Sequence, residues 1–176
     1  MTRRHFITTA AALTAVSAQA APVRLKIGQI ATTHAHAGGK MGAMRGLTDL
    51  WDVVGYVEPE EALRAQLAES PIYRGLPLLT EEQLLATPDL KAVAVETRVE
   101  DSCATALRCI RAGKHVHLDK PGALEHAEFK SMRLEAEQKG LTVQMGYMLR
   151  YNPAFELLFK AVKEGWLGEI TEIDAA

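Results

Sequence analysis

The sequence of 176 residues lacks the features of two common classes of protein. Its 20 Lys and Arg residues do not exceed its 22 Asp and Glu residues, and only 6% of its residues are aromatic. A nucleic-acid-binding protein needs clustered positive charge against the phosphate backbone, so this composition argues against that role. The chain also has no apolar run of the roughly 18 residues that a membrane-spanning helix needs. We therefore expect neither a nucleic-acid partner nor a membrane partner.

Cysteine is scarce as well. The two cysteines, Cys103 and Cys109, lie in a segment that has the pattern of a helix. Six helical residues rise about 9 Å, which exceeds the roughly 7 Å that separates Cα atoms in the widest disulfides. We therefore predict two free thiols. With 48% apolar residues the chain can still form a core, so intrinsic disorder is excluded.

The first 20 residues have the layout of an export signal. Arg3, Arg4 and His5 precede a mildly apolar stretch at 6–16, and Ala18-Gln19-Ala20 offers small residues to a signal peptidase. The paired arginines and the weakly hydrophobic core resemble a twin-arginine signal. We expect a cleaved signal over residues 1–20, the twin-arginine export machinery as a partner, and a periplasmic or otherwise exported location. A cytosolic protein with an Ala-rich start is the alternative.

From residue 22 onward, short apolar runs alternate with longer segments of helical period. We expect strands at residues 23–30, 53–57, 72–73, 91–97, 115–118 and 142–146. The run from Ala92 to Val95 is apolar at every position, as in strands that are buried on both faces of a parallel sheet. A capping box at Thr80 to Gln83 indicates a helix start between two of these strands. The predicted fold class is α/β, with a doubly wound parallel sheet over residues 22–148.

The last segment, residues 149–176, has a different pattern. Asn152 as N-cap and Pro153 at the first helical position predict a helix to about Glu164. Residues 169–173 then alternate polar and apolar, which is typical of a half-buried strand. Because the chain offers this strand no partner, we expect residues 149–176 to be only the start of a truncated second domain. A strand added to the first sheet is the alternative.

The turn after the first expected strand has an altered dinucleotide-binding pattern. Open parallel sheets bind ligands outside the carboxyl ends of their strands, where a G-x-G-x-x-G turn would hold a pyrophosphate. Here Ala31, Thr33 and His36 occupy the three glycine positions. Backbone amides at the helix start, with the side chains of Thr32, Thr33 and His34, can still offer donors to an anion.

Glu58 follows the second expected strand. An acid at this place suits hydrogen bonding to the ribose of an adenosine. With Glu60 and Glu61 beside it, the acid would repel a 2′-phosphate, which favours NAD and makes NADP a less suitable cofactor. The alternative is an ordinary solvated acid at the start of a helix.

The most specific motif is AGKHVHLDKP at residues 112–121. Together with RYNP at 150–153 and GWLGE at 165–169, it resembles the Gfo/Idh/MocA oxidoreductases, and the resemblance runs from about residue 23 to the end of the chain. It implies that residues 22–148 form an NAD(P)-binding Rossmann domain, and that residues 149–176 begin a truncated α+β domain for substrate binding and oligomerisation. A homo-oligomer is expected only if that second domain is present. In that family a strand leads into Glu-Lys-Pro, with the lysine beside the nicotinamide and the substrate. The matching residues here are Asp119, Lys120 and Pro121.

The resemblance implies roles for the residues at the strand ends. Lys120 would be the catalytic residue and assist proton movement as hydride passes between a substrate carbon and NAD. Thr97, Asp119 and Lys120 would contact the cofactor, and Lys120, Tyr147 and Arg150 would contact the substrate. The family's Thr-Pro-Asn after the fourth strand is Thr97-Arg98-Val99 here, so only the threonine is kept.

The predicted function is that of an exported NAD-dependent oxidoreductase of sugar- or cyclitol-like polyols. Two alternatives stay open, an NAD-retaining glycosidase of the same family and a nucleotide- or sugar-binding remnant without turnover. Four histidines near the strand ends are conceivable metal ligands: His34, His36, His115 and His117. No cysteine or carboxylate pattern at metal-site spacing accompanies them, so we expect no metal.

Overall fold

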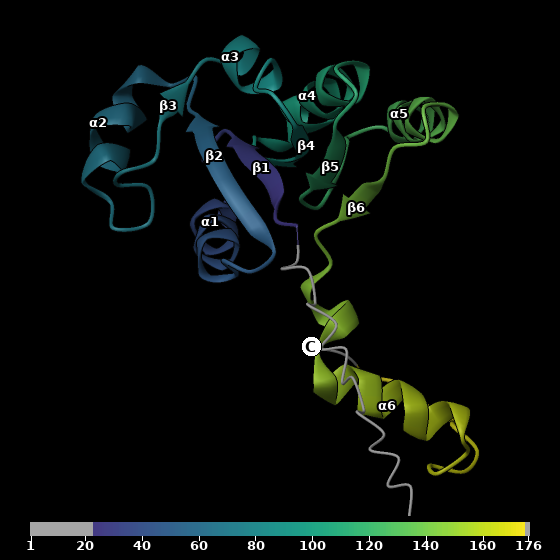
Figure 1. Cartoon of the computed structure of the whole chain (residues 1–176). Coiled ribbons are helices and arrows are strands. Elements are labelled where there is room, and N and C mark those ends of the chain that lie inside the picture. The colour runs from purple at the N-terminus through teal and green to yellow at the C-terminus, as the bar shows by residue number, and fades with distance from the viewer. Residues whose placement is uncertain (1–22, 175–176) are drawn as a thin grey trace, which may run out of the picture.

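The computed structural model describes residues 23–174, and the export signal expected over residues 1–20 lies outside this range. Six strands form one sheet (Figure 1). They are β1 (Leu25–Ile30), β2 (Trp51–Val57), β3 (Leu78–Leu79), β4 (Leu90–Val95), β5 (His115–Leu118) and β6 (Val143–Met145). Their order is β3-β2-β1-β4-β5-β6, and every neighbouring pair is parallel. The predicted α/β fold with a doubly wound parallel sheet is confirmed, and its strand order is that of a Rossmann fold.

The helices that connect the strands cover both faces of the sheet. They are α1 (Ala37–Gly46), α2 (Glu61–Glu69), α3 (Glu81–Leu85), α4 (Val99–Arg111) and α5 (His126–Gln138). A short 3₁₀ helix, η1 (Met148–Tyr151), and α6 (Pro153–Lys163) follow the last strand. Among the described residues, none of these helices has the length and apolar character needed to cross a membrane.

The core is divided into two clusters, one on each face of the sheet. Ile110 of α4 and Met132 of α5 pack against Val93 and Leu118 in the larger cluster. On the other face, the α1 side chains Met41 and Met44, with others, pack against the sheet. Because both faces of β4 are covered, its run of apolar residues is buried, as the sequence predicts.

Two expected strands were wrong. Residues 72–73 lie in a turn, and the third strand is the later pair that forms β3. Tyr73 is buried because its ring lies 5.0 Å from that of Tyr56 and its hydroxyl accepts a hydrogen bond from Gln29 Nε2 at 2.8 Å, so its burial comes from loop packing. Residues 169–173 form no strand either, since no neighbouring strand among the described residues offers them a ladder.

The predicted helix ends and thiols are confirmed. Thr80 and Gln83 form the capping box of α3, and Asn152 Oδ1 accepts a hydrogen bond from the Ala154 amide at the start of α6. Cys103 and Cys109 are free and buried, and burial raises the pKa of Cys109 to about 12.

Helix α6 extends away from the sheet (Figure 1). Several of its apolar side chains and of those that follow it are exposed: Leu157, Leu158, Phe159, Val162, Trp166 and Leu167. Its capped N-terminus lies within the segment expected to begin a second domain, and the residues that position the candidate site all come before it.

Candidate functional site

The carboxyl edge of the sheet has its switch point between β1 and β4, the two central strands from which the strand order runs in opposite directions. The turn after β1 lies over this point and is held on both sides. The Ala31 amide donates to the Val57 carbonyl at 2.8 Å, and the His34 amide donates to the Glu96 carbonyl at 3.0 Å. The ends of β1, β2 and β4 are therefore fixed relative to one another.

Ala31 has the backbone conformation that the missing first glycine would supply. Its φ is 65°, in the left-handed region, and its side chain is buried. An L-residue in this region costs about 1–2 kcal/mol relative to the right-handed one. The turn thus keeps a glycine-like backbone although an alanine occupies the position.

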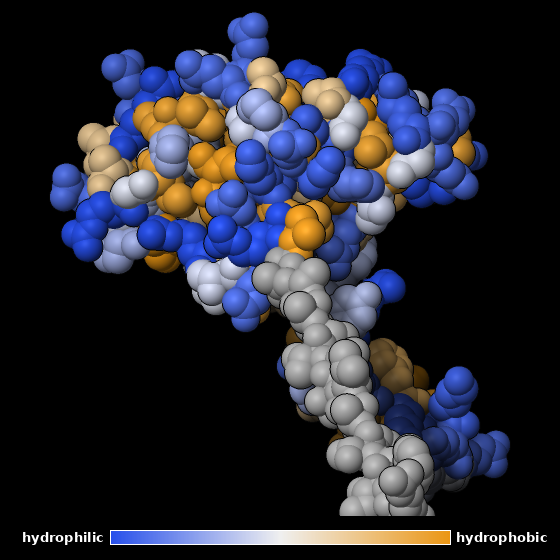
Figure 2. All heavy atoms as spheres, in the orientation of Figure 1, coloured by the Kyte–Doolittle hydropathy of each residue, from blue (hydrophilic) through white to orange (hydrophobic). Residues whose placement is uncertain are grey.

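A cleft of about 610 Å³ opens beside this turn. Its walls include Ala31, Val57, Glu58, Leu78, Leu79 and Thr97. Figure 2 shows apolar residues at the surface over β2 and β3, the strands that supply Val57, Leu78 and Leu79. The cleft therefore combines an apolar wall with polar and charged side chains, and both kinds of group occur in small-molecule sites.

Glu58 and Thr97, both predicted from the sequence, are two of the polar residues that line this cleft; the others are Arg64, Thr80, Glu81, Gln83, Asp101, Thr105 and Arg108. Glu58 is 1% exposed; its Oε1 accepts a hydrogen bond from the Glu60 amide at 2.8 Å, and its Oε2 accepts one from the Thr32 hydroxyl. The Thr97 hydroxyl is buried without a hydrogen-bond partner among the described residues. Thr33 is half-buried in the turn. Of the eight cofactor-binding residues that the sequence suggests, Ala31, Glu58 and Thr97 line this cleft and Thr32 is bonded to Glu58. The other four do not line it: Thr33, His34, Asp119 and Lys120.

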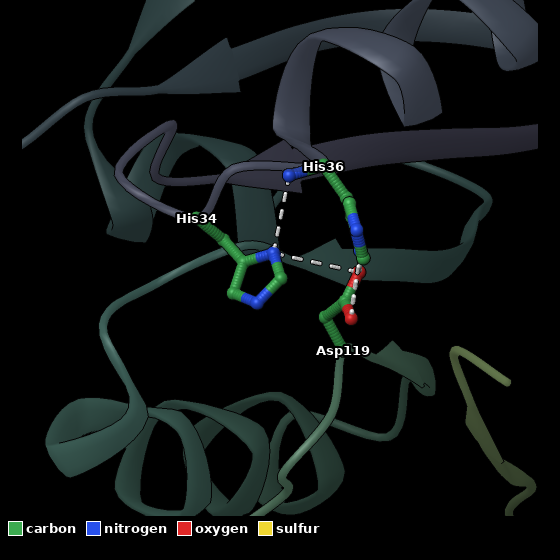
Figure 3. A group of neighbouring side chains, drawn as sticks. All are labelled: His34, His36 and Asp119. Carbon is green, nitrogen blue, oxygen red and sulfur yellow. Dashed lines mark hydrogen bonds and ion pairs between the residues drawn. The ribbon is translucent and has the colours of Figure 1, made fainter. Parts of the chain in front are cut away.

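Asp119 is the centre of a second, charged group at this edge (Figure 3). The Lys40 ammonium donates to its Oδ2 at 2.9 Å, the Lys120 amide donates to its Oδ1 at 2.7 Å, and His36 Nδ1 lies 3.1 Å from Oδ2. His34 Nδ1 lies 3.6 Å from the same Oδ2. Burial by itself would raise the pKa of Asp119, but the lysine ammonium and the amide hold it at about 2, so this carboxylate stays ionised.

Glu96, at the end of β4, lies on the other side of the same lysine. Its Oε1 accepts a hydrogen bond from Lys40 Nζ at 3.4 Å, while its Oε2 is buried without a partner among the described residues. Burial raises the pKa of Glu96 to about 7, against the effect of Lys40. His117 Nε2 also contacts Lys40 Nζ, and burial followed by this positive charge lowers the pKa of His117. The Lys40 ammonium thus contacts two carboxylates and one imidazole.

The expected substrate-binding residues lie apart from the expected catalytic lysine. Tyr147 and Arg150 line a second cleft of about 470 Å³, together with Lys40 and His117. The Arg150 guanidinium lies 6.0 Å from the centre of the Tyr147 ring. Lys120 is exposed and lines neither of these two clefts. Its contact with the site is made through its backbone amide.

Lys40 is the functional residue that the sequence reasoning missed. It lies on α1 and reaches partners on β4 and β5 that are 56 to 79 residues away. A signal was available, because His36 and Lys40 are four residues apart at the start of a helix and so lie on one face. The sequence does name Glu96 as an acid at a strand end, but not its pairing with this lysine.

The sequence of the chain also matches a known protein family. Residues 27–147 match the GFO_IDH_MocA model, described as an oxidoreductase family with an NAD-binding Rossmann fold. The chain is 32% identical over 121 residues to the uncharacterized oxidoreductase YhhX of Escherichia coli, which covers 68% of this chain and 33% of that protein. It is 33% identical over 94 residues to 1,5-anhydro-D-fructose reductase of Ensifer adhaerens, which covers 53% of this chain and 28% of that protein. The chain thus spans about a third of the length of these relatives.

Solved structures give the same result for the fold. The crystal structure of the oxidoreductase yhhX superposes with a TM-score of 0.71 at 26% identity, over 83% of this chain and 42% of that one. A 3-ketoreductase from Actinomadura kijaniata in complex with NADP has a TM-score of 0.72 at 23% identity, over 84% of this chain and 46% of that one. At this identity, the second likeness concerns the fold alone.

Proposed function

The chain belongs to the Gfo/Idh/MocA oxidoreductase family, whose nucleotide-binding domain is a Rossmann fold, and we propose that it is the cofactor-binding part of an exported, NAD-dependent oxidoreductase of sugar- or cyclitol-like polyols. The observation that carries the cofactor proposal is the buried carboxylate of Glu58 at the edge of the 610 Å³ cleft. A fully buried acid with fixed orientation suits the paired hydroxyls of a ribose.

The other groups of the cleft fit an adenosine nucleotide as well. The apolar wall formed by Val57, Leu78 and Leu79 offers a surface to a flat base, and the buried Thr97 hydroxyl has a hydrogen bond to give or accept. A Cβ is present at every position of the first turn, yet Ala31 keeps the left-handed backbone that the tight turn of this motif requires. We expect NAD to bind better than NADP, because Glu58 would repel a 2′-phosphate.

NAD, when bound, supplies the hydride acceptor, and the protein's own residues handle the substrate and its proton. Tyr147 and Arg150 would donate hydrogen bonds to substrate hydroxyls from the second cleft. Lys120 would take up the proton of the reacting hydroxyl, as its place in the DKP motif suggests. Its exposed side chain is free to reach over the edge of the sheet, while Asp119 fixes its backbone. The sugar-like substrate is supported by relatives such as 1,5-anhydro-D-fructose reductase.

The proposal is tested by titrating the purified chain with NADH and, separately, with NADPH while nicotinamide fluorescence is recorded. We expect saturable binding of one NADH per chain, weaker binding of NADPH, and a melting temperature that rises with NADH concentration. Absence of both saturation and a melting shift would show that the cleft does not take the dinucleotide. NADH formation with polyols, compared with cleavage of aryl glycosides, then separates dehydrogenase from glycosidase activity.

Export is a separate part of the proposal and rests on residues 1–20 of the sequence. A fusion of these residues to a reporter should leave the cytoplasm through the twin-arginine route. Replacing Arg3 and Arg4 with lysine should stop this transport, and the reporter should then stay in the cytoplasm. Transport that continues with both lysines present would contradict the twin-arginine assignment.

A further inference from the structure

We propose that the turn after β1 and the end of β5 bind a divalent transition-metal ion of the zinc class, with His34, His36 and Asp119 as ligands and the buried carboxylate of Glu96 beside His34. Imidazole nitrogen and carboxylate oxygen are ligands that zinc takes in proteins. The sequence alone argued against a metal because no carboxylate lies near the two histidines in the chain. The fold supplies both carboxylates from the neighbouring ends of β4 and β5.

The spacing of the ligand atoms suits a tetrahedral site. One ligand atom from each of His34, His36 and Asp119 lies within 4.8 Å of the others. Zinc bonds to nitrogen and oxygen of about 2.0–2.1 Å place neighbouring tetrahedral ligands about 3.3 Å apart. His36 Nδ1 and His34 Nδ1 lie 3.1 and 3.6 Å from Asp119 Oδ2, and His34 Nδ1 lies 3.7 Å from Glu96 Oε2. One of these three distances is slightly shorter and two are slightly longer than the separation of about 3.3 Å in a tetrahedral zinc site.

The ring nitrogen of His34 is in the form that binds a metal. The His36 amide donates a hydrogen bond to His34 Nδ1 at 3.2 Å, so this nitrogen is unprotonated, and its single lone pair would exchange that hydrogen bond for the metal. Figure 3 shows that both rings and the Asp119 carboxylate turn toward one another. The three ligands therefore face a common point.

Glu96 provides an independent sign that a ligand belongs here. Its side chain is fully buried, and Oε2 has no hydrogen-bond partner among the described residues although it lies 3.7 Å from His34 Nδ1. A buried carboxylate oxygen left without a partner costs free energy. A cation held by His34 would place positive charge next to this oxygen.

Lys40 is the group that competes with a metal. Its ammonium lies 2.9 Å from Asp119 Oδ2 and 3.4 Å from Glu96 Oε1. The oxygen that Lys40 contacts on Glu96 is not the one that faces His34, so a metal held by His34 and the lysine would face opposite oxygens of this carboxylate. At Asp119 the two would share Oδ2, and Lys40 keeps Glu96 Oε1 and His117 as partners when it moves.

An ion can reach the site from solvent. The side chains of His34 and His36 are 14% and 26% exposed, while the two carboxylates behind them are buried. Both histidines lie at the β1 turn, beside the proposed dinucleotide cleft. The metal proposal depends only on these side chains and is independent of the proposed function.

The test is a titration of the full chain, first freed of metal with a chelator, with Zn²⁺ alone and no dinucleotide present. We expect calorimetry to give one Zn²⁺ per chain, and Co²⁺ in its place to give the intense visible absorption of a tetrahedral complex. His34→Gln and His36→Gln should each weaken Zn²⁺ binding by more than about 100-fold, since even the loss of an outer hydrogen bond to a ligand typically costs 10- to 100-fold. The matched control is His126→Gln, an exposed histidine at the start of α5, which should bind Zn²⁺ like the unchanged chain.

Asp119→Asn extends the test to the buried carboxylate, and circular dichroism reports whether this variant still folds. The two histidine variants keep the test decisive if it does not, because their side chains are partly exposed. Absence of Zn²⁺ binding to the unchanged chain would overturn the proposal. So would tight binding that survives both His34→Gln and His36→Gln, because the ion would then lie elsewhere. Neither result would bear on NADH binding, which is measured without metal.

Discussion

Replacing Glu58 with glutamine tests the cofactor preference at the atom that sets it. The substitution keeps the shape of the side chain and removes its negative charge. The amide oxygen can still accept the hydrogen bond from the Glu60 amide, which holds Glu58 Oε1 at 2.8 Å. The NH₂ group cannot accept the hydrogen bond of the Thr32 hydroxyl or a second hydroxyl of a ribose.

The size of the effect follows from the kind of hydrogen bond that is lost. A hydrogen bond to a charged group contributes about 1.5–3 kcal/mol, which corresponds to binding weaker by about 10- to 150-fold. We expect Glu58→Gln to weaken NADH binding by this factor. The affinity for NADPH should fall less, because the same substitution removes the charge that repels a 2′-phosphate. The ratio of the NADH affinity to the NADPH affinity should therefore decrease.

Fluorescence titrations with NADH and NADPH measure both affinities for each variant. Glu69→Gln is the matched control, because Glu69 is exposed at the end of α2 and loses the same charge. It should leave both affinities within about twofold, as expected for a surface charge. Equal losses for both dinucleotides in Glu58→Gln, at an unchanged melting temperature, would refute the ribose role of this carboxylate.

Three further predictions concern stability, each measured by urea unfolding. A Cβ at Gly28 would lie 2.5 Å from Leu84 Cδ1, so Gly28→Ala should lower the free energy of unfolding by about 1–3 kcal/mol. The effect of Gly28→Ala should be smaller in a chain that also carries Leu84→Ala. If the effects of the two substitutions simply add, this contact does not cause the loss. Burial, the largest effect, raises the pKa of Tyr73 from 10.0 to about 12, so the contribution of its neutral form is complete below pH 10 and is lost as the pH rises toward 12. Between pH 10 and 12, the free energy of unfolding of Tyr73→Phe should therefore fall by up to about 2.7 kcal/mol less than that of the unchanged chain. Equal decreases in the two proteins would show that Tyr73 does not titrate in this range. Thr80→Ala removes the capping box of α3 and should cost about 1 kcal/mol, whereas Thr80→Ser should cost much less.

The sheet could be predicted from the sequence because its strands have strong local signals. The buried run that forms β4 is apolar at nearly every position, and the alternation of such runs with helical segments requires parallel strands. β3 has only two residues, Leu78 and Leu79, which is too short for a pattern to be detected. Tyr73 led to the wrong prediction of a strand at residues 72–73, because a loop that buries an aromatic side chain cannot be distinguished by composition from a short buried strand.

The candidate site could be predicted only where a residue directly follows a strand. Glu58 and Thr97 come immediately after β2 and β4, and parallel strands bring those ends to one edge, so their common cleft follows from topology. The pairing of Lys40 with Asp119 has no such basis. It depends on the rotation of α1 about its axis and on the reach of a long side chain across 79 residues of sequence. Contacts of this kind need coordinates.

The first turn explains how a dinucleotide fold keeps its backbone without its glycines. Only the first of the three positions has a backbone that favours glycine, since Ala31 has φ 65° and His36, at the third, has φ −90° and begins α1 as its N-cap. A side chain at the third position therefore causes no backbone strain, and here it is an imidazole that contacts Asp119. The cost of about 1–2 kcal/mol at Ala31 is offset by the hydrogen bonds that hold the turn to Val57 and Glu96. The missing glycines thus leave a left-handed turn at Ala31 and change its chemistry, because His36 places an imidazole where the G-x-G-x-x-G pattern has bare backbone.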